Sequence, residues 1–199
     1  MRRSEFEIKD KTIIEDIFST SDYGTFALCM ENRPYSIPVN FVYDGKVIYF
    51  HGAKKGRKKE YILANSFASF SIAQPYSIIQ SYFTATDGMA CPATHFFRSV
   101  CCDGRIIIVE NYDEKVKALS LLMKKLQPEG KYKPLDEEIY KKMINAVEVF
   151  RFEIEEVNGK LKVGQNLPKE KINMILENLE KRDNEIDKLT MKAIMEQYN

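Results

Sequence analysis

The chain has 199 residues with 30 Lys and Arg against 29 Asp and Glu, which gives a formal net charge of +1. This length suits one domain with a sizeable hydrophobic core. The balanced charge leaves no net cationic field to hold nucleic acid, so any basic patch must be local. No apolar run approaches the roughly 18 residues of a membrane span. From the balanced charge we expect no nucleic-acid binding, and from the short apolar runs we expect no membrane binding.

The first residues and the cysteines bear on location and metal binding. Met1-Arg2-Arg3 begins like a signal peptide, but residues 4–10 are largely charged where an apolar segment should follow. The cysteines lack Cys-x-x-Cys spacing and the density of a disulfide scaffold. A metal cluster is disfavoured because the adjacent Cys101 and Cys102 cannot easily converge with Cys91 and His95 on one tetrahedral ion. We expect free thiols, no metal and a cytoplasmic protein.

The N-terminal third predicts a helix followed by strands. Asp10 can cap a short helix in which Ile13, Ile14, Ile17 and Phe18 recur at helical spacing. Residues 25–30 are typical of a strand, which leads through a turn at 31–34 into a second strand. Pro38 cannot donate a ladder hydrogen bond, so this second strand is predicted to be irregular or at an edge.

The stretch 33–51 predicts a β-hairpin. Two strand-like runs meet at Asp44-Gly45, a dipeptide typical of a two-residue turn, which would place Tyr43 opposite Lys46. Neighbouring side chains on a strand point to opposite faces. The predicted core face carries Val39, Phe41, Ile48 and Phe50. The opposite face, which we expect to line a site, carries Ser36, Pro38, Asn40, Tyr49 and His51.

A basic loop follows the hairpin. Five cations, Lys54, Lys55, Arg57, Lys58 and Lys59, surround Gly56 at the start of a helix predicted over 58–64. Free backbone N–H groups, the positive end of a helix dipole and a guanidinium are what a bound phosphate needs. A solvated basic loop is the alternative, but the position after a polar-faced hairpin favours the phosphate site. The glycine motifs of P-loop and Rossmann proteins are absent.

The middle of the chain continues the β pattern. Residues 67–73 alternate as a strand in which Ser69 and Ser71 oppose the apolar set, whereas residues 74–91 are ambiguous. Residues 93–102 and 105–109 predict a second hairpin around Asp103-Gly104.

The last part predicts mostly helices. Asn111 and Glu114 offer a capping box for a helix that ends before Pro128, and residues 136–146 predict another. A half-buried strand over 150–155 ends at Asn158-Gly159. Beyond residue 160, Pro168 opens a helix with an apolar stripe, and the pattern resumes after an interruption at 181–184.

The motifs R-P-Y-S-I-P-V-N-F, D-G-x-x-x-Y-F-H-G-A and G-R-K stand in order in the central stretch. They resemble the FMN-binding split-barrel superfamily related to pyridoxamine 5′-phosphate oxidase, and more closely its nitroimidazole-reductase (Nim-like) branch. The resemblance implies a mainly β fold with flanking helices, a Greek-key split β-barrel over 1–159. Residues 160–199 are then a C-terminal helical extension that packs on the dimer. Within it, G-K-L-K-V-G-Q-N resembles the tail of regulator-like split-barrel relatives.

The resemblance also implies a cofactor and its site. In this family the P-V-N-F strand lies along the isoalloxazine ring, the H-G-A strand end abuts it, and the G-R-K loop takes the FMN phosphate. A homodimer with flavin sites at the subunit interface is implied, in which Arg98 and Ser99 serve the partner's flavin; an exposed strand charge is an equal alternative for Arg98. The implied cofactor-binding residues are Ser36, Pro38, Val39, Asn40, His51, Gly52, Ala53, Gly56, Arg57, Lys58, Arg98 and Ser99.

His51 is the candidate catalytic residue, because it shares the polar hairpin face and precedes the phosphate-like loop. His95 lacks such a context and is expected to be structural or interfacial. The resemblance implies an FMN-dependent oxidoreductase that passes electrons from an external reductant, with NAD(P)H as a candidate, to a small-molecule acceptor. No nicotinamide-binding fingerprint is present. The alternative is a flavin- or haem-binding sensor without fast turnover.

Overall fold

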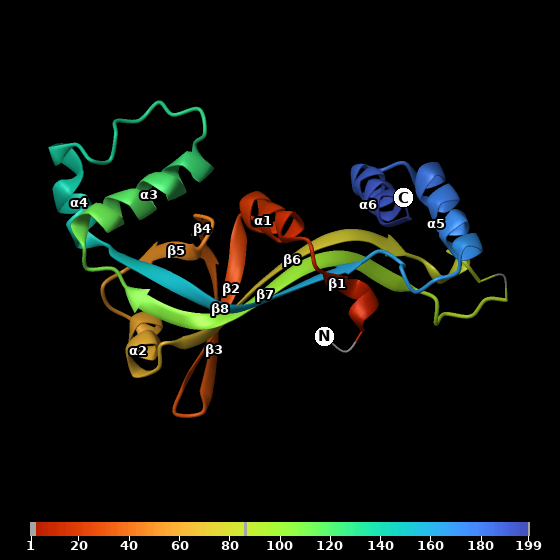
Figure 1. Ribbon diagram of the computed structural model, residues 1–199, viewed down its shortest axis with the longest axis horizontal. Coiled ribbons are helices and arrows are strands. Elements are labelled where there is room, and N and C mark those ends of the chain that lie inside the picture. The colour runs from red at the N-terminus through yellow and green to blue at the C-terminus, as the bar shows by residue number, and fades with distance from the viewer. Residues whose placement is uncertain (1–2, 86, 199) are drawn as a thin grey trace. The chain divides into compact units, whose positions relative to one another are not determined.

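The structure is a computed structural model that describes residues 3–85 and 87–198 (Figure 1). It divides into two compact units, each described here by itself. The barrel unit comprises Thr12–Ile72 and Cys101–Val157. The terminal unit comprises Met1–Lys11, Ala73–Val100 and Asn158–Asn199.

One sheet contains most of the strands, in the order β3-β2-β6-β7-β8-β5-β4, and β1 pairs with β8 (Figure 1). The pairs β2–β3, β2–β6, β4–β5 and β5–β8 are antiparallel. The strand bounds are β1 (Glu7–Ile8), β2 (Tyr23–Met30), β3 (Arg33–Asn40), β4 (Val42–Tyr43), β5 (Val47–Gly52), β6 (Phe67–Ile79), β7 (Thr94–Ile108) and β8 (Glu148–Lys162).

The sheet of the barrel unit closes on itself. Strands β3 and β4 stand at opposite ends of the strand order, yet Phe41 alone separates the last residue of β3 from the first residue of β4. The sheet must therefore curve until its two end strands meet, which is the geometry of a barrel. The predicted mainly β split barrel with flanking helices is confirmed.

Phenylalanine rings fill the barrel. The Phe26 ring centroid lies 4.7 Å from Phe50, 4.6 Å from Phe70 and 5.2 Å from Phe152, and Phe41 and Phe150 extend the group. All six rings are at most 1 % exposed. Gly24 makes room for one of them, because a Cβ there would lie 2.0 Å from the Phe70 ring. We call this set, Phe26, Phe41, Phe50, Phe70, Phe150 and Phe152, the phenylalanine core.

The first hairpin forms with a different register from the predicted one. Tyr43 pairs with Ile48 rather than Lys46, and β3 pairs along its length with β2 instead of β5. The reason is Asp44, whose Oδ1 accepts from the N–H groups of Lys46 at 3.1 Å and Val47 at 3.0 Å, so it opens the turn instead of occupying its centre. The observed register differs from the predicted one by two residues, and a shift by an even number leaves each side chain on its predicted face of the sheet. The predicted core face is buried.

The second predicted hairpin is wrong. Asp103 and Gly104 lie inside β7, which runs on without a turn. A Cβ at Gly104 would lie 2.0 Å from the carbonyl oxygen of Glu153, so the glycine permits a close approach of β8. The predicted strand end at Gly159 is also wrong, because that residue pairs with Ile8 of β1 and β8 continues.

Helices flank the sheet, with bounds α1 (Lys11–Thr20), α2 (Arg57–Ala64), α3 (Tyr112–Leu126), α4 (Lys141–Ala146), α5 (Lys169–Arg182) and α6 (Glu185–Tyr198). Short 3-10 turns cover Ser4–Phe6, Ser81–Phe83 and Glu138–Tyr140. The predicted cap of α3 is confirmed, since Asn111 Oδ1 accepts from the Glu114 N–H at 2.9 Å. The helix predicted over 136–146 is shorter, because a 3-10 turn precedes α4. Among the described residues, no helix combines the length and apolarity that a bilayer crossing requires.

A buried ionic network attaches the C-terminal helices to β6 of the same chain. Asp187 of α6 is fully buried and accepts from Arg182 Nε at 2.7 Å and from the Ser77 hydroxyl at 2.5 Å. Arg182 Nη1 also donates to Gln80 Oε1 at 2.8 Å. The arginine beside Asp187 is the main reason that the pKa of this carboxyl is lowered. Packing of the extension on a dimer partner stays a prediction.

Truncation of the phenylalanine core should destabilise the barrel unit strongly. We expect Phe26→Ala to lower the free energy of unfolding by about 3 to 5 kcal/mol, because three ring contacts are lost and a cavity remains. The matched control is Phe67→Ala, since Phe67 is 46 % exposed and contacts Arg105 at the surface. Its expected loss is about 1 kcal/mol. Urea unfolding measures both, and equal losses would contradict a core role for Phe26.

Candidate functional site

The loop between β5 and α2 presents free backbone donors. Gly56 precedes α2 with φ 118°, and among the described residues no side chain caps it. Glu60 is the first residue of the helix whose N–H bonds back, to the Gly56 carbonyl at 3.2 Å. The three preceding N–H groups of the first turn therefore have no intrahelical acceptor. Since the N-terminus of a helix is also its positive end, this turn is suited to an anion.

Two tyrosines hold Arg57 at this turn. Its guanidinium carbon lies 4.3 Å from the Tyr35 ring centroid and 5.2 Å from that of Tyr61. Its Nη2 donates to the Tyr61 hydroxyl at 3.2 Å, and the two rings are 5.1 Å apart. We call Tyr35 and Tyr61 the tyrosine clamp. Its effect is to fix the plane of a cation that stays exposed to solvent.

Lys58 turns toward the barrel. Its Nζ lies 5.4 Å from the ring centroids of both Phe50 and Phe150 and donates to the His51 carbonyl at 3.3 Å. Gly52 makes this position possible, because a Cβ there would lie 2.4 Å from the ammonium. Burial lowers the pKa of Lys58. The next residue, Lys59, forms an ion pair with Glu148, so Lys54, Lys55 and Arg57 are the cations that the loop offers to a ligand.

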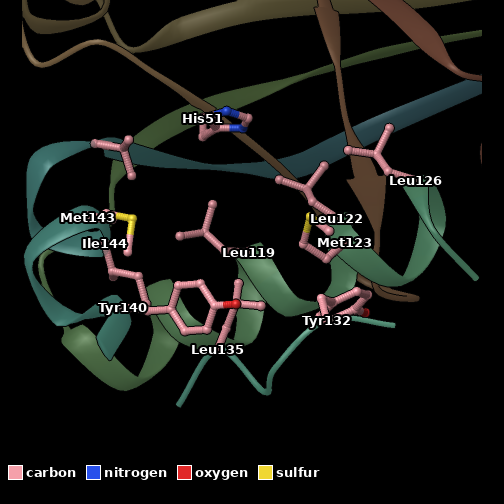
Figure 2. A pocket seen from close by; sticks show the side chains of 11 residues that line it. His51, Leu119, Leu122, Met123, Leu126, Tyr132, Leu135, Tyr140, Met143 and Ile144 are labelled. Atoms are coloured by element: carbon pink, nitrogen blue, oxygen red, sulfur yellow. The ribbon is translucent and has the colours of Figure 1, made fainter. Parts of the chain in front are cut away.

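His51 stands at an apolar pocket of about 260 Å³ in the barrel unit. Figure 2 shows its ring on one side of the pocket and side chains of α3 and of the segment 132–147 on the others. The other lining residues are Leu119, Leu122, Met123, Leu126, Tyr132, Leu135, Tyr140, Met143, Ile144 and Val147. Burial, followed by the charge of Lys58, lowers the pKa of His51 below its ordinary value of 6.5. The imidazole is therefore neutral near pH 7.

The residues predicted to share the polar face of the first hairpin lie in different places in the structure. Ser36 and Pro38 are exposed on β3, where they pair with Ala27 and Thr25 of β2, and Asn40 donates to the Asp22 carbonyl at 2.7 Å. Together with Ser69 and Ser71 of β6, these strands form a shelf of small side chains, which we define as Thr25, Ala27, Ser36, Pro38, Ser69 and Ser71. Val39 is buried beneath it.

Tyr49 belongs to the packing under α3. It is 3 % exposed, and its hydroxyl donates to Glu114 Oε1 at 3.0 Å, while Arg151 Nη1 donates to the same oxygen at 2.7 Å. Burial and then the bond to Glu114 raise the pKa of Tyr49 to about 12. The expectation that this hydroxyl is satisfied locally is confirmed.

Arg98 and Ser99 lie on β7 in the terminal unit, both half-buried. The Nε of Arg98 donates to Gln74 Oε1 at 2.6 Å. Their predicted contact with a partner's flavin stays a prediction. The same unit holds His95, whose Nε2 lies 3.1 Å from the Tyr76 carbonyl oxygen.

The sequence interpretation missed the tyrosine clamp and the pocket. Tyr61 stands four residues after Arg57, a spacing that places helical side chains side by side. The predicted helix begins at residue 58, whereas α2 begins at Arg57, so this half of the clamp was missed by one residue. No local pattern brings Tyr35 of β3 to α2. Nothing in the sequence indicates that residues 132–144 return to face α3.

The donors at α2 fit a phosphate group. They comprise the free N–H groups of the first turn, the clamped guanidinium of Arg57 and the exposed ammonium groups of Lys54 and Lys55. In the described part of the chain, no group of three or more His, Cys, Asp or Glu side chains is placed to hold a metal ion.

Comparison with known proteins identifies a family and several solved structures that this chain resembles. The family model described as pyridoxamine 5′-phosphate oxidase matches residues 10–161. A solved protein from Bacteroides thetaiotaomicron, described as a candidate 5-nitroimidazole antibiotic resistance protein, is 22 % identical with a TM-score of 0.64. That alignment covers 77 % of this chain and 85 % of the other. A search of curated proteins found no match.

Two further solved structures are similar. The flavocytochrome Anf3 from Azotobacter vinelandii has a TM-score of 0.67 at 21 % identity, over 79 % of this chain and 69 % of that chain. The FAD and haem binding protein from Mycobacterium smegmatis has a TM-score of 0.63 at 18 % identity, over 78 % and 73 % of the two chains. At such identities these likenesses establish the fold.

The pKa of His51 should respond to Lys58. We expect Lys58→Met to raise the His51 pKa while leaving it below 6.5, because the repulsive charge is removed and the burial remains. Two-dimensional NMR of the imidazole carbons across a pH series measures this, with His95→Gln assigning the signals. Lys46→Met, at an exposed turn, is the control. An unchanged or lower pKa in Lys58→Met would contradict the placement of the ammonium.

Proposed function

Since the chain belongs to the pyridoxamine 5′-phosphate oxidase family, we propose that it is a cytoplasmic, FMN-dependent oxidoreductase of the nitroimidazole-reductase type. It would take electrons from an external reductant, with NAD(P)H as the candidate, and pass them to a small-molecule acceptor. The observation that carries this proposal is the uncapped first turn of α2 beside the clamped Arg57, because these donors match a nucleotide phosphate.

FMN is the flavin that the loop suits best. It ends in a single phosphate, and the barrel unit offers one helix start with free N–H groups, a fixed guanidinium and two exposed lysines. The shelf of small side chains supports a flat ring system beside β3, since Ser36 and Pro38 project little from the sheet. The small, exposed side chain of Ala53 likewise allows a ligand to approach the backbone.

A homodimer is part of the proposal. In such a dimer, Arg98 and Ser99 of the partner subunit would complete the flavin site, as the family resemblance implies.

When bound, the flavin supplies the electron or hydride transfer. The chain supplies the remaining parts of the mechanism. Arg57 and the first turn of α2 anchor the phosphate, and the apolar pocket accepts the hydrocarbon part of an acceptor while excluding water. The neutral imidazole of His51 stands at the rim, where its N–H can donate a hydrogen bond to a polar group of that acceptor and stabilise negative charge as it develops.

A flavin- or haem-binding sensor is the second candidate. The observation that favours it is His51 itself, because an imidazole beside an apolar pocket is also what an axial haem ligand requires. Two structural relatives are described as a flavocytochrome and as a FAD and haem binding protein. A visible spectrum of the purified protein distinguishes flavin bands from a haem Soret band.

Removal of the clamped guanidinium should weaken flavin binding. We expect Arg57→Ala to raise the dissociation constant for FMN by roughly 10- to 150-fold, which corresponds to about 1.5 to 3 kcal/mol for a charge-assisted phosphate contact. Quenching of flavin fluorescence on titration into the apoprotein measures it. Arg105→Ala is the matched control, because Arg105 also stacks on a ring, that of Phe67 at 3.6 Å, but lies outside the loop. Equal affinity in Arg57→Ala and wild type would count against this phosphate site.

Substitution of His51 should separate catalysis from cofactor binding. We expect His51→Ala to keep FMN, with the flavin spectrum intact, and to lose turnover at least tenfold with an acceptor on which negative charge develops. His51→Gln, which retains an N–H donor, should recover part of the rate. Stopped-flow measurements of the reductive and oxidative half-reactions locate the defect, and wild-type rates on several acceptors would show that His51 has no catalytic role.

A further inference from the structure

The terminal unit contains a second pocket, of about 330 Å³. Three segments distant in sequence meet at it: the N-terminal residues with Arg3 and Phe6, the β7 start with Thr94 and Phe96, and the end of β8 with Lys162 together with the following turn, which holds Asn166. All of these residues belong to the terminal unit, and none of them belongs to the loop or lines the apolar pocket of the barrel unit.

The G-K-L-K-V-G-Q-N stretch builds one wall of this pocket. Gln165 holds the turn after β8, since its Oε1 accepts from the Val163 N–H and its Nε2 donates to the Leu161 carbonyl, both at 2.9 Å. Gly164 has φ 95°, and a Cβ there would lie 2.7 Å from Ile172 Cδ1. Tyr198 of α6 donates to the Gly164 carbonyl at 3.1 Å. This bracing places Lys162 and Asn166 along the pocket.

The charges around the pocket are unbalanced. Arg3, Lys162 and Lys171 line it and Lys160 stands beside it on β8, yet among the described residues none of the four forms an ion pair. Burial, followed by the charges of Lys160 and Arg3, lowers the pKa of Lys162. Glu170 in the first turn of α5 is an exposed acid, and Glu7 stands opposite Lys160 in the β1–β8 ladder. Three lysines and one arginine outnumber these two acids, and this excess of positive charge favours the arrival of an anion.

Lys162 is oriented for such a ligand. Its Nζ donates to the Thr94 hydroxyl, which leaves two further N–H groups on the ammonium. The Asn166 amide adds a donor and an acceptor at the same wall. Lys162 ends β8 and is held by Thr94, and Asn166 lies in the turn that Gln165 and Tyr198 fix, so the two form a polar end of the pocket.

Part of the remaining lining is apolar. Phe6, Ile79, Phe96 and Ile175 line the pocket but are at most 3 % exposed, whereas Pro92, Ala93 and Leu167 offer more accessible apolar surface. The ammonium of Lys160 lies 5.8 Å from the Phe6 ring centroid, and the Arg3 guanidinium carbon lies 5.9 Å from it. Inorganic phosphate alone would leave this apolar surface uncovered, so the lining favours a ligand with a hydrocarbon body next to its charge.

We propose that the terminal unit binds a small organic anion, with a carboxylate or phosphate at Lys162 and an aromatic or aliphatic body against Pro92 and Leu167. This site shares no residue with the loop before α2 or with the apolar pocket, and it takes no part in electron transfer. Because the terminal helices α5 and α6 contribute Lys171 and the Tyr198 brace, ligand binding also stabilises the C-terminal extension. Such coupling would give the extension the properties of a ligand-responsive element.

Four matched probes test the two parts of the ligand. Phenyl phosphate and benzoate carry charge and ring, benzyl alcohol carries the ring alone, and inorganic phosphate carries charge alone. Titrations use the FMN-loaded protein and amide NMR, so that the loop before α2 is already occupied. We expect shifts at Lys162, Gly164 and Asn166, with benzyl alcohol and inorganic phosphate binding at least tenfold more weakly than phenyl phosphate. Equal affinity of phenyl phosphate and benzyl alcohol would overturn the proposal.

Substitutions locate the site. Lys162→Met should weaken phenyl phosphate binding at least tenfold, whereas Lys181→Met, an exposed position on α5 outside the pocket, should leave it unchanged. Lys171→Gln provides a second variant at the rim if Lys162→Met does not fold. Arg57→Ala should retain phenyl phosphate binding even where FMN is lost, so failure of the flavin site is distinguishable from failure of this one. Shifts confined to residues 54–59, or wild-type affinity in both pocket variants, would refute the site.

Discussion

Closure of the barrel around the phenylalanine core is the constraint on which the candidate flavin site depends. Phe26 contacts rings from β5, β6 and β8, so it joins strands that are distant in the strand order. Burial of six such rings is a large favourable term, since each removes extensive apolar surface from water. The curvature that this burial enforces also brings the end of β3 next to β4, which a flat sheet would hold far apart.

The geometry of the loop before α2 depends on this phenylalanine core. Phe50 and Phe150 receive the Lys58 ammonium, and the missing side chain at Gly52 gives it space. One cation of the loop is thereby turned inward, while the tyrosine clamp turns Arg57 along the surface. The phenylalanine rings, Gly52 and the tyrosine clamp thus determine which cations of the loop are exposed to solvent. The inward cation, Lys58, is also one cause of the lowered pKa of His51.

The sequence predicted the faces of the strands better than their partners. Alternation assigned Val39, Phe41, Ile48 and Phe50 to the interior, and this holds in the structure because a two-residue change of register preserves faces. Partners depend on contacts between distant segments, which local patterns do not contain. Gly104 illustrates this limit of local patterns. The Asp103-Gly104 dipeptide is typical of a turn, but it lies inside β7, where the glycine allows β8 to approach closely. For the same reason the basic loop was foreseeable, whereas the apolar pocket formed by α3 and residues 132–147 was not.

The tyrosine clamp has a thermodynamic consequence. A free arginine at a surface loses rotamer freedom when it captures a ligand, and that loss opposes binding. Arg57 has given up much of this freedom already, because Tyr35 and Tyr61 confine it before any ligand arrives. A lysine at this position would keep the charge but not the planar stacking, so it would have to be immobilised at each encounter. The chemical identity of the cation, and not its charge alone, therefore limits which substitutions the loop tolerates.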